Sequence, residues 1–183
     1  MTLDLRLMGS SGWALIAGGV LYWLFYSSEV GGFELGDDYW MLTLSIHALT
    51  IVAIVVGLVG GHSAFAVRGW ASRLWWVSTA FAFLGLTVGN PLFSVAVFGL
   101  AVLAFARLHA PVVALLLAVG GGLWLYLFIL GVRVGDQNAQ PPTGSEELMG
   151  IAATTLMSLG LIGLGVLAIG STSGQESKSA TSA

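Results

Sequence analysis

The sequence predicts an all-α integral membrane protein that folds as a bundle of six transmembrane helices. Three observations carry this prediction. Hydrophobic residues make up 57% of the 183 residues and charged residues only 8%, whereas about a quarter of the residues in a soluble domain are charged. The mean hydropathy is +0.93, and apolar stretches follow one another almost without pause from Gly12 to Gly170. The chain is therefore predicted to form one transmembrane domain, residues 1–170.

The first two spans are predicted at residues 10–28 and 40–60, each close to the roughly 20 apolar residues that a crossing needs. The first span follows Arg6, as the apolar run of a signal peptide follows a cation. However, Tyr22 and Phe25 occupy its distal end, where a signal peptide needs small residues for cleavage. We therefore expect the first span to be retained.

The region 74–106 is too long for one ordinary span and is interrupted by Asn90 and Pro91. A residue before proline disfavours helix, and proline suits the first turn of a new helix. The sequence thus predicts two short helices, 74–89 and 91–106, joined by a tight Asn-Pro turn. At roughly 24 Å each, they form either two short spans with local bilayer thinning or a re-entrant hairpin. The rival interpretation, one long kinked helix, would reverse the orientation of everything that follows.

The fifth and sixth spans are predicted at residues 111–132 and 147–170. Thr143 and Glu146 have the spacing of a capping box, which would open the last helix. The remaining residues, 171–183, are rich in serine and contain no apolar side chain larger than alanine. We expect this segment to be a disordered cytoplasmic tail.

The positions of the cations favour six crossings. With a cytoplasmic N-terminus, five of the six cations fall inside: Arg6, Arg68, Arg73, Arg107 and Lys178. Five crossings would instead divide the cations four against two, so the positive-inside rule supports the six-crossing model, with both termini cytoplasmic and the chain in the cell membrane.

The exception, Arg133, is expected to pair with Asp136, Glu146 or Glu147 on an acidic outer face. An acidic outer loop with Glu34, Asp37 and Asp38 lies on the same face and is interpreted as a solvated, cation-attracting surface.

Composition also limits the partners of the chain. The absence of cysteine excludes disulfides and thiolate chemistry, and the absence of a basic patch argues against nucleic acid. The lipid bilayer is the expected partner.

Small residues spaced four apart let helix backbones approach closely, either within the bundle or in a homo-oligomer or larger membrane complex. These pairs are Gly57 and Gly61, Gly85 and Gly89, Ala14 and Gly18, and Ala118 and Gly122. Arginine outnumbers lysine five to one, which suits a GC-rich prokaryotic genome.

His47 is the one ionisable side chain well inside a predicted span. Ionisable residues within a membrane are functional candidates by default, because burying them is costly. The alternative is structural: a neutral imidazole is cheaper to bury than a charge, and it can bond to Thr43, one turn earlier, or to a backbone carbonyl.

Two further sets of residues are candidates for ligand contacts. The first is a glycine run beside two aromatic residues in the fifth span, which predicts a hydrophobic pocket. It comprises Gly120, Gly121, Gly122, Trp124 and Tyr126. The second is His62 with His109, at matching depth on different helices, which could ligate haem or another metal. Both histidines lie in connections beside arginines, where interfacial histidines are ordinary, so no cofactor or metal is expected.

No segment carries a catalytic motif, so the chain is not expected to be an enzyme. The favoured interpretation is a non-enzymatic accessory, assembly or scaffold component of the membrane, because the spans are almost free of charged side chains and rich in small residues. A small transporter or channel for a neutral or apolar solute is the first alternative. A haem- or quinone-associated electron-transfer subunit is the second.

Overall fold

The computed structural model describes residues 2–30, 40–88, 90–130 and 144–181, and the regular structure in these ranges is entirely helical. Side chains are described for residues 10–26, 41–88, 91–130 and 144–171. The described ranges form six helices: α1 (Thr2–Val30), α2 (Trp40–Ala64), α3 (Trp70–Val88), α4 (Asn90–Ala106), α5 (Pro111–Ile129) and α6 (Ser145–Thr181). The all-α prediction is confirmed for the described part of the chain.

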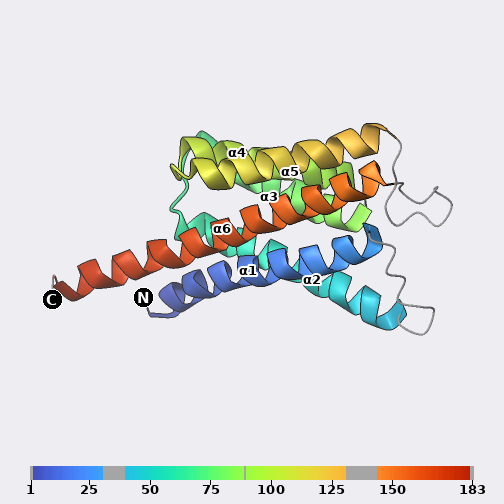
Figure 1. The fold of residues 1–183 in the computed structure, drawn as a ribbon. Helices are drawn as coiled ribbons and strands as arrows, with labels where there is room; N and C mark the ends of the chain where they lie inside the picture. Colours follow the sequence, from blue (N-terminus) through green and yellow to red (C-terminus); the bar gives the residue numbers. More distant parts are fainter. Residues whose placement is uncertain (1, 31–39, 89, 131–143, 182–183) are drawn as a thin grey trace.

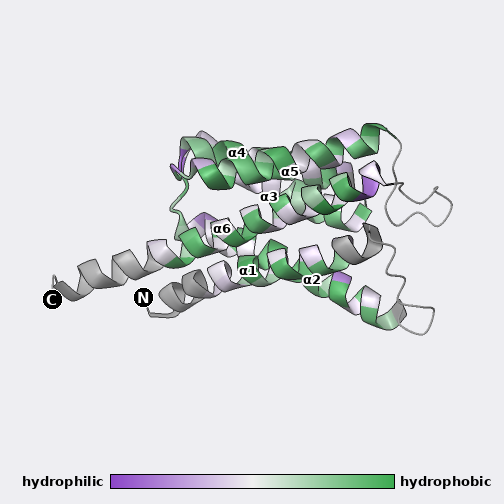
Figure 2. Cartoon of the chain, viewed as in Figure 1, coloured by the Kyte–Doolittle hydropathy of each residue, from purple (hydrophilic) through white to green (hydrophobic). Residues whose placement is uncertain are grey.

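Three of these helices are long and apolar enough to cross a membrane by length and composition. They contain the stretches Met41–Ala64, Pro111–Ile129 and Ser145–Ser171, and Pro91–Ala106 is a shorter apolar helix. Figure 2 shows hydrophobic residues along the sides of the helices and hydrophilic ones mainly at the two ends of the bundle. The protein is thus a membrane protein, as its composition predicts.

The helices run lengthwise beside one another and pack as a ring (Figure 1). Each helix contacts the next one along the chain, and α1 packs against α6 to close the ring. Consecutive helices are antiparallel, because residue numbers rise along one helix in the direction in which they fall along the next. Between α1 and α2, Gly18 lies against Ile54 and Ser11 against Gly60. Between α5 and α6, Gly120 lies against Met157 and Leu117 against Gly160.

The closest helix contacts occur where glycine leaves out a side chain. A Cβ atom built on Gly12 of α1 would lie 2.6 Å from the carbonyl oxygen of Gly165 on α6, and one built on Gly165 would lie 2.5 Å from that of Gly12. Since real Cβ atoms do not approach other atoms this closely, these backbones can touch only because both residues are glycine. Gly57, one of the glycines with four-residue spacing, makes the same kind of contact, since a Cβ atom there would lie 2.8 Å from the backbone nitrogen of Leu15.

Most helix ends agree with the sequence prediction because local signals set them. Pro111 stands in the first turn of α5, where its missing N–H costs nothing. Gly69, with φ +65°, supplies the left-handed residue just before α3. Four boundaries differ by four residues or more. α1 starts at Thr2, eight residues before the predicted start, and α2 ends at Ala64, four residues after the predicted end. α3 starts at Trp70, four residues before the predicted start, and α6 continues to Thr181, through the segment for which the composition predicts disorder. No proline interrupts that segment, so the helical hydrogen-bond ladder can extend.

Candidate functional site around His47

His47 lies on α2 against aromatic side chains of α1. Its imidazole centroid is 4.6 Å from the ring centroid of Phe25 and 6.3 Å from that of Tyr26. The series of ring contacts continues across the bundle to α4 and α5. Tyr22 lies 5.0 Å from Phe93 of α4, and Tyr26 lies 6.2 Å from Trp124 of α5. We call these side chains the aromatic cluster: Tyr22, Phe25, Tyr26, His47, Phe93 and Trp124.

The sequence builds the cluster from one face of α1. Tyr22, Phe25 and Tyr26 have the i, i+3, i+4 spacing that places side chains together on a helix. All three are buried, as are Phe93 and Trp124. The cluster joins α1 and α2 on one side of the ring to α4 and α5 on the other, so it occupies the interior of the bundle rather than its lipid-facing surface.

The cluster contains polar atoms whose hydrogen-bonding capacity is not used. Within the described part of the chain, Nδ1 of His47 and Nε1 of Trp124 are buried and have no hydrogen-bond partner. The imidazole does interact with the backbone of Leu86 on α3, so His47 connects α2 to the last turns of α3. Leaving a buried polar atom without a partner costs about 1–3 kcal/mol. Such atoms in a native structure often mark a place where a ligand or water binds.

Replacing His47 by phenylalanine is expected to raise the free energy of unfolding by about 1 kcal/mol, because removing the unpartnered Nδ1 outweighs losing the interaction with the backbone of Leu86, and a ring stays against Phe25. Thermal unfolding of the purified protein in a mild detergent measures this change. Thr50→Val is the matched control, since the buried hydroxyl of Thr50 already donates to the carbonyl of Ile46, at 2.8 Å. A loss of stability in His47→Phe would show that the imidazole is a structural hydrogen-bonding group.

The glycine run predicted to form a pocket contacts two different helices. A Cβ atom on Gly120 would lie 2.8 Å from the backbone nitrogen of Met157 on α6. One on Gly121 would lie 3.3 Å from Val97 of α4, and one on Gly122 would lie 3.7 Å from Phe98 of α4. Trp124 belongs to the aromatic cluster, whereas Tyr126 is half exposed. The run therefore brings α5 close to its neighbours, and only Trp124 of the five predicted residues joins the cluster.

His62 and His109 have different surroundings. Nε2 of His62 lies 2.8 Å from the hydroxyl oxygen of Ser72, and its ring is 5.0 Å from that of Trp76. His109 is exposed in the connection between α4 and α5 and has the left-handed φ of +52°. Where the structure describes the chain, no three histidine or acidic side chains lie close enough together to hold a metal ion.

Other predicted features fall outside what the structure describes. Neither the acidic loop with Glu34, Asp37 and Asp38 nor Arg133 is within the described residues, and the same holds for Gly89 and Thr143. The side chain of Asn90 is also outside them, whereas Pro91 stands in the first turn of α4.

The aromatic partners of His47 are the part of the site that the sequence did not reveal. The signal was present: three aromatic residues share one face near the end of the first span, and His47 lies about two turns into the second. Because two antiparallel helices place these positions at a similar depth, the pairing could have been found from the connection between them.

No family model, curated protein or solved structure matches this chain. The class of protein is therefore set by the fold itself, which is that of an all-helical membrane protein with a polar group within an aromatic interior.

Proposed function

We propose that this chain is a prokaryotic multi-pass protein of the cell membrane that acts as a non-enzymatic accessory, assembly or scaffold component. Six helices cross the bilayer, with both termini in the cytoplasm. The single observation that carries the role is the tightly packed interior of the bundle, where three buried threonine hydroxyls that could line a polar path are bonded to their own helices.

The hydroxyls of the interior support this role. Thr50 donates to the carbonyl of Ile46 at 2.8 Å, and Thr79 donates to the carbonyl of Trp75 at 2.9 Å. Thr154 likewise donates to Gly150 at 2.9 Å. A hydroxyl that bonds to the carbonyl four residues earlier satisfies its donor locally and adds little to a solute pathway.

Bulky side chains fill the remaining space. Those with almost no exposed surface include Tyr22, Trp75, Phe93, Leu117 and Met157. Such tight packing suits a rigid body that binds other membrane components on its outside. A carrier, by contrast, needs interior groups that can rearrange around a solute.

The distribution of charge at the two ends of the bundle supports the orientation. Arg107 follows the end of α4, and its guanidinium carbon lies 5.2 Å from the ring centroid of Trp70, at the start of α3. Arg68 and Arg73 flank Trp70, so these three arginines share one end of the bundle. Glu146 and Glu147 open α6, which runs antiparallel to α5 and so begins at the opposite end. The positive-inside rule assigns the arginine end to the cytoplasm.

The pairing of α3 with α4 supports six crossings rather than five. Gly85 lies against Phe93 and Gly99 lies against Ser78, so the two helices are antiparallel and the chain returns to the end it left. With 19 and 17 residues, they extend about 28 and 26 Å, close to the hydrocarbon thickness of roughly 30 Å. We take α3 and α4 to be two full, slightly short spans.

A reporter enzyme fused after Ala110, with the remaining chain removed, is expected to behave as cytoplasmic. The same fusion after Ile129 serves as the control and is expected to behave as external, because α5 then crosses once more. An external result for Ala110 together with a cytoplasmic one for Ile129 would replace the six-crossing model by the five-crossing one.

The role itself is tested by extracting the full chain from its host membrane in polymer-bounded lipid discs and quantifying the proteins in them by mass spectrometry. The expected result is one set of partner proteins at a fixed ratio near one to the chain, and no Soret absorbance. Purification of the chain alone would overturn the proposal. A Soret band would instead favour haem, with His62 and His109 as the ligands to test.

A second candidate function is the binding or transport of a small neutral solute. The observation that favours it is the pair of buried, unpartnered polar atoms on His47 and Trp124, which a solute with one donor and one acceptor could satisfy. Proteoliposomes distinguish the two functions. Solute flux that His47→Ala abolishes, while Thr50→Val leaves it unchanged, would favour this candidate over the scaffold role.

A further inference from the structure

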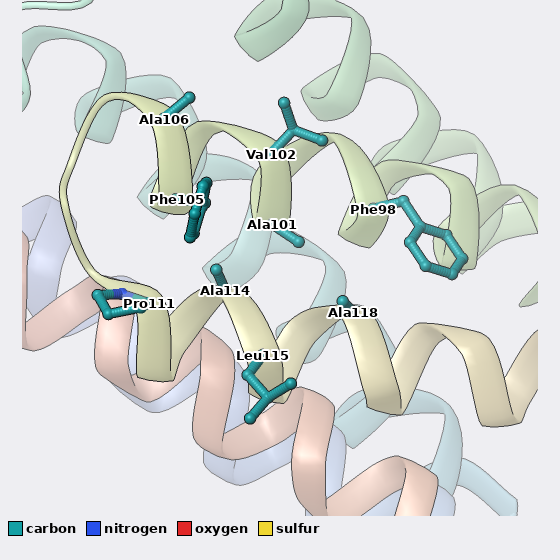
Figure 3. Close-up of a pocket in the computed structure, with 9 residues that line it drawn as sticks. All are labelled: Phe98, Ala101, Val102, Phe105, Ala106, Pro111, Ala114, Leu115 and Ala118. Carbon is teal, nitrogen blue, oxygen red and sulfur yellow. The ribbon is translucent and has the colours of Figure 1, made fainter.

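An apolar groove lies on the outside of the bundle between α4 and α5, apart from the aromatic cluster (Figure 3). Its volume is about 560 Å³. The residues that line it are Phe98, Ala101, Val102, Phe105, Ala106, Pro111, Ala114, Leu115 and Ala118. Phe105 and Leu115 are 67% and 64% exposed, so the groove opens onto the surface that faces lipid in a membrane.

The shape of the groove suits a flexible chain better than a helix. In Figure 3, Ala101 points from α4 toward α5, and Ala114 and Ala118 point from α5 toward α4, so small side chains form the floor. The phenyl rings of Phe98 and Phe105 stand over this floor. Small residues let two helix backbones touch only where no bulky side chain stands between the helices. A helix about 10 Å wide would meet these rings first, whereas an acyl chain can lie between them.

The groove ends beside the basic end of the bundle. Ala106, the last residue of α4, lines the groove, and the exposed Arg107 follows it directly. The guanidinium of Arg107 lies over the ring of Trp70 at the start of α3, and Arg68 and Arg73 lie at the same end of the bundle. The described acidic side chains, Glu146 and Glu147, are at the opposite end. An anion at the mouth of the groove would therefore meet only cations among the described side chains.

We propose that the groove between α4 and α5 binds an acyl chain of an anionic phospholipid whose phosphate contacts Arg107. The two halves of the site act on different parts of the lipid. The apolar groove holds the chain by packing, but it cannot favour one headgroup, since every bilayer lipid offers similar tails. The selection for negative charge comes from the basic end, as it does where basic pockets between transmembrane helices bind anionic headgroups. This inference requires a membrane location but does not depend on the scaffold role.

The test uses the full chain reconstituted in vesicles of equal parts phosphatidylglycerol and phosphatidylcholine, extracted in a mild detergent, with retained lipid counted by native mass spectrometry. The wild-type chain is expected to retain phosphatidylglycerol in preference to phosphatidylcholine. Arg107→Gln is expected to lower this preference roughly fivefold. Arg73→Gln is the matched control, because Arg73 is exposed at the same end but does not adjoin the groove, and its effect is expected to be small.

A second pair of variants tests the groove itself. Ala118→Leu fills the floor and is expected to reduce retention of both lipids, whereas Ala80→Leu, the same change at an exposed position of α3, is expected to leave retention unchanged. Phe105→Ala removes one wall at a largely exposed position. It is expected to reduce retention without depending on whether leucine fits at position 118.

Three results would overturn the proposal. Equal retention of the two lipids by the wild-type chain would remove the selection for charge. Equal effects of Arg107→Gln and Arg73→Gln would mean that a diffuse surface potential, and not a site at the groove, selects the anionic lipid. Loss of a co-purifying protein in Ala118→Leu, with lipid retention unchanged, would assign the groove to a partner helix. None of these results decides the scaffold role, which depends on the stoichiometry of partner proteins.

Discussion

Replacing Trp75 by alanine is expected to lower the free energy of unfolding by about 3–5 kcal/mol, the cost of truncating a large buried aromatic residue. Trp75 has no exposed surface, and its Nε1 donates to the carbonyl of Leu58 on α2, at 2.7 Å. Its ring also fills the space beside Gly61, where a Cβ atom would lie 2.9 Å from it, and lies 5.6 Å from the ring of Phe65. One side chain thus provides much of the contact that joins α2 to α3.

Unfolding of the purified protein in mixed detergent measures this loss. Trp76→Ala is the matched control, because Trp76 is the next residue and is 45% exposed, and it is expected to cost much less. Trp75→Phe separates the two contributions, since it keeps most of the ring and removes the hydrogen bond, which is worth about 1 kcal/mol. Equal losses in Trp75→Ala and Trp76→Ala would mean that the contact between α2 and α3 does not limit the stability of the bundle.

The sequence was sufficient to predict the helices because the signals that define them are local. Long apolar stretches, the Asn90-Pro91 pair and Pro111 each act within a few residues of their own position. The start of α3 was predicted less well, because the local signal there pointed to the wrong residue. Arg73 suggested a connection up to residue 73, yet a cation near a helix end can extend its charged group toward water while its backbone stays helical. The helix therefore begins earlier, at Trp70.

The closure of the ring of helices and the contacts of the aromatic cluster with α4 and α5 could not be predicted, because they depend on positions distant in the sequence. The contact between Gly12 and Gly165 joins the first helix to the last, and nothing near either residue indicates its partner. His47 was singled out because it is ionisable, but its surroundings come from α1 and α3. The four-residue glycine spacing predicted close packing without indicating which helix would approach, and the groove required the three-dimensional arrangement of α4 and α5.

The effect of adding one methyl group at a glycine tests how far these close approaches define the fold. Gly85→Ala is expected to lower the free energy of unfolding by about 3 kcal/mol, at the upper end of the cost of overpacking. A Cβ atom at this position would overlap the backbone nitrogen and Cα of Phe93 on α4. Backbone atoms cannot rotate away as the end of a side chain can, and the short connection between α3 and α4 leaves little freedom for the helices to separate.

The same substitution at Gly170 is expected to have the opposite sign. A Cβ atom there would meet nothing within 4 Å, so Gly170→Ala replaces the poorer helix former by the better one and should add up to about 1 kcal/mol. Both variants are compared in one unfolding series in mixed detergent. If Gly85→Ala were as stable as the wild-type chain, α3 and α4 could separate without cost, and their pairing would no longer be an argument that the chain returns at Asn90-Pro91 to the end it left. A loss confined to Gly85→Ala would instead make that pairing a measured constraint on the topology.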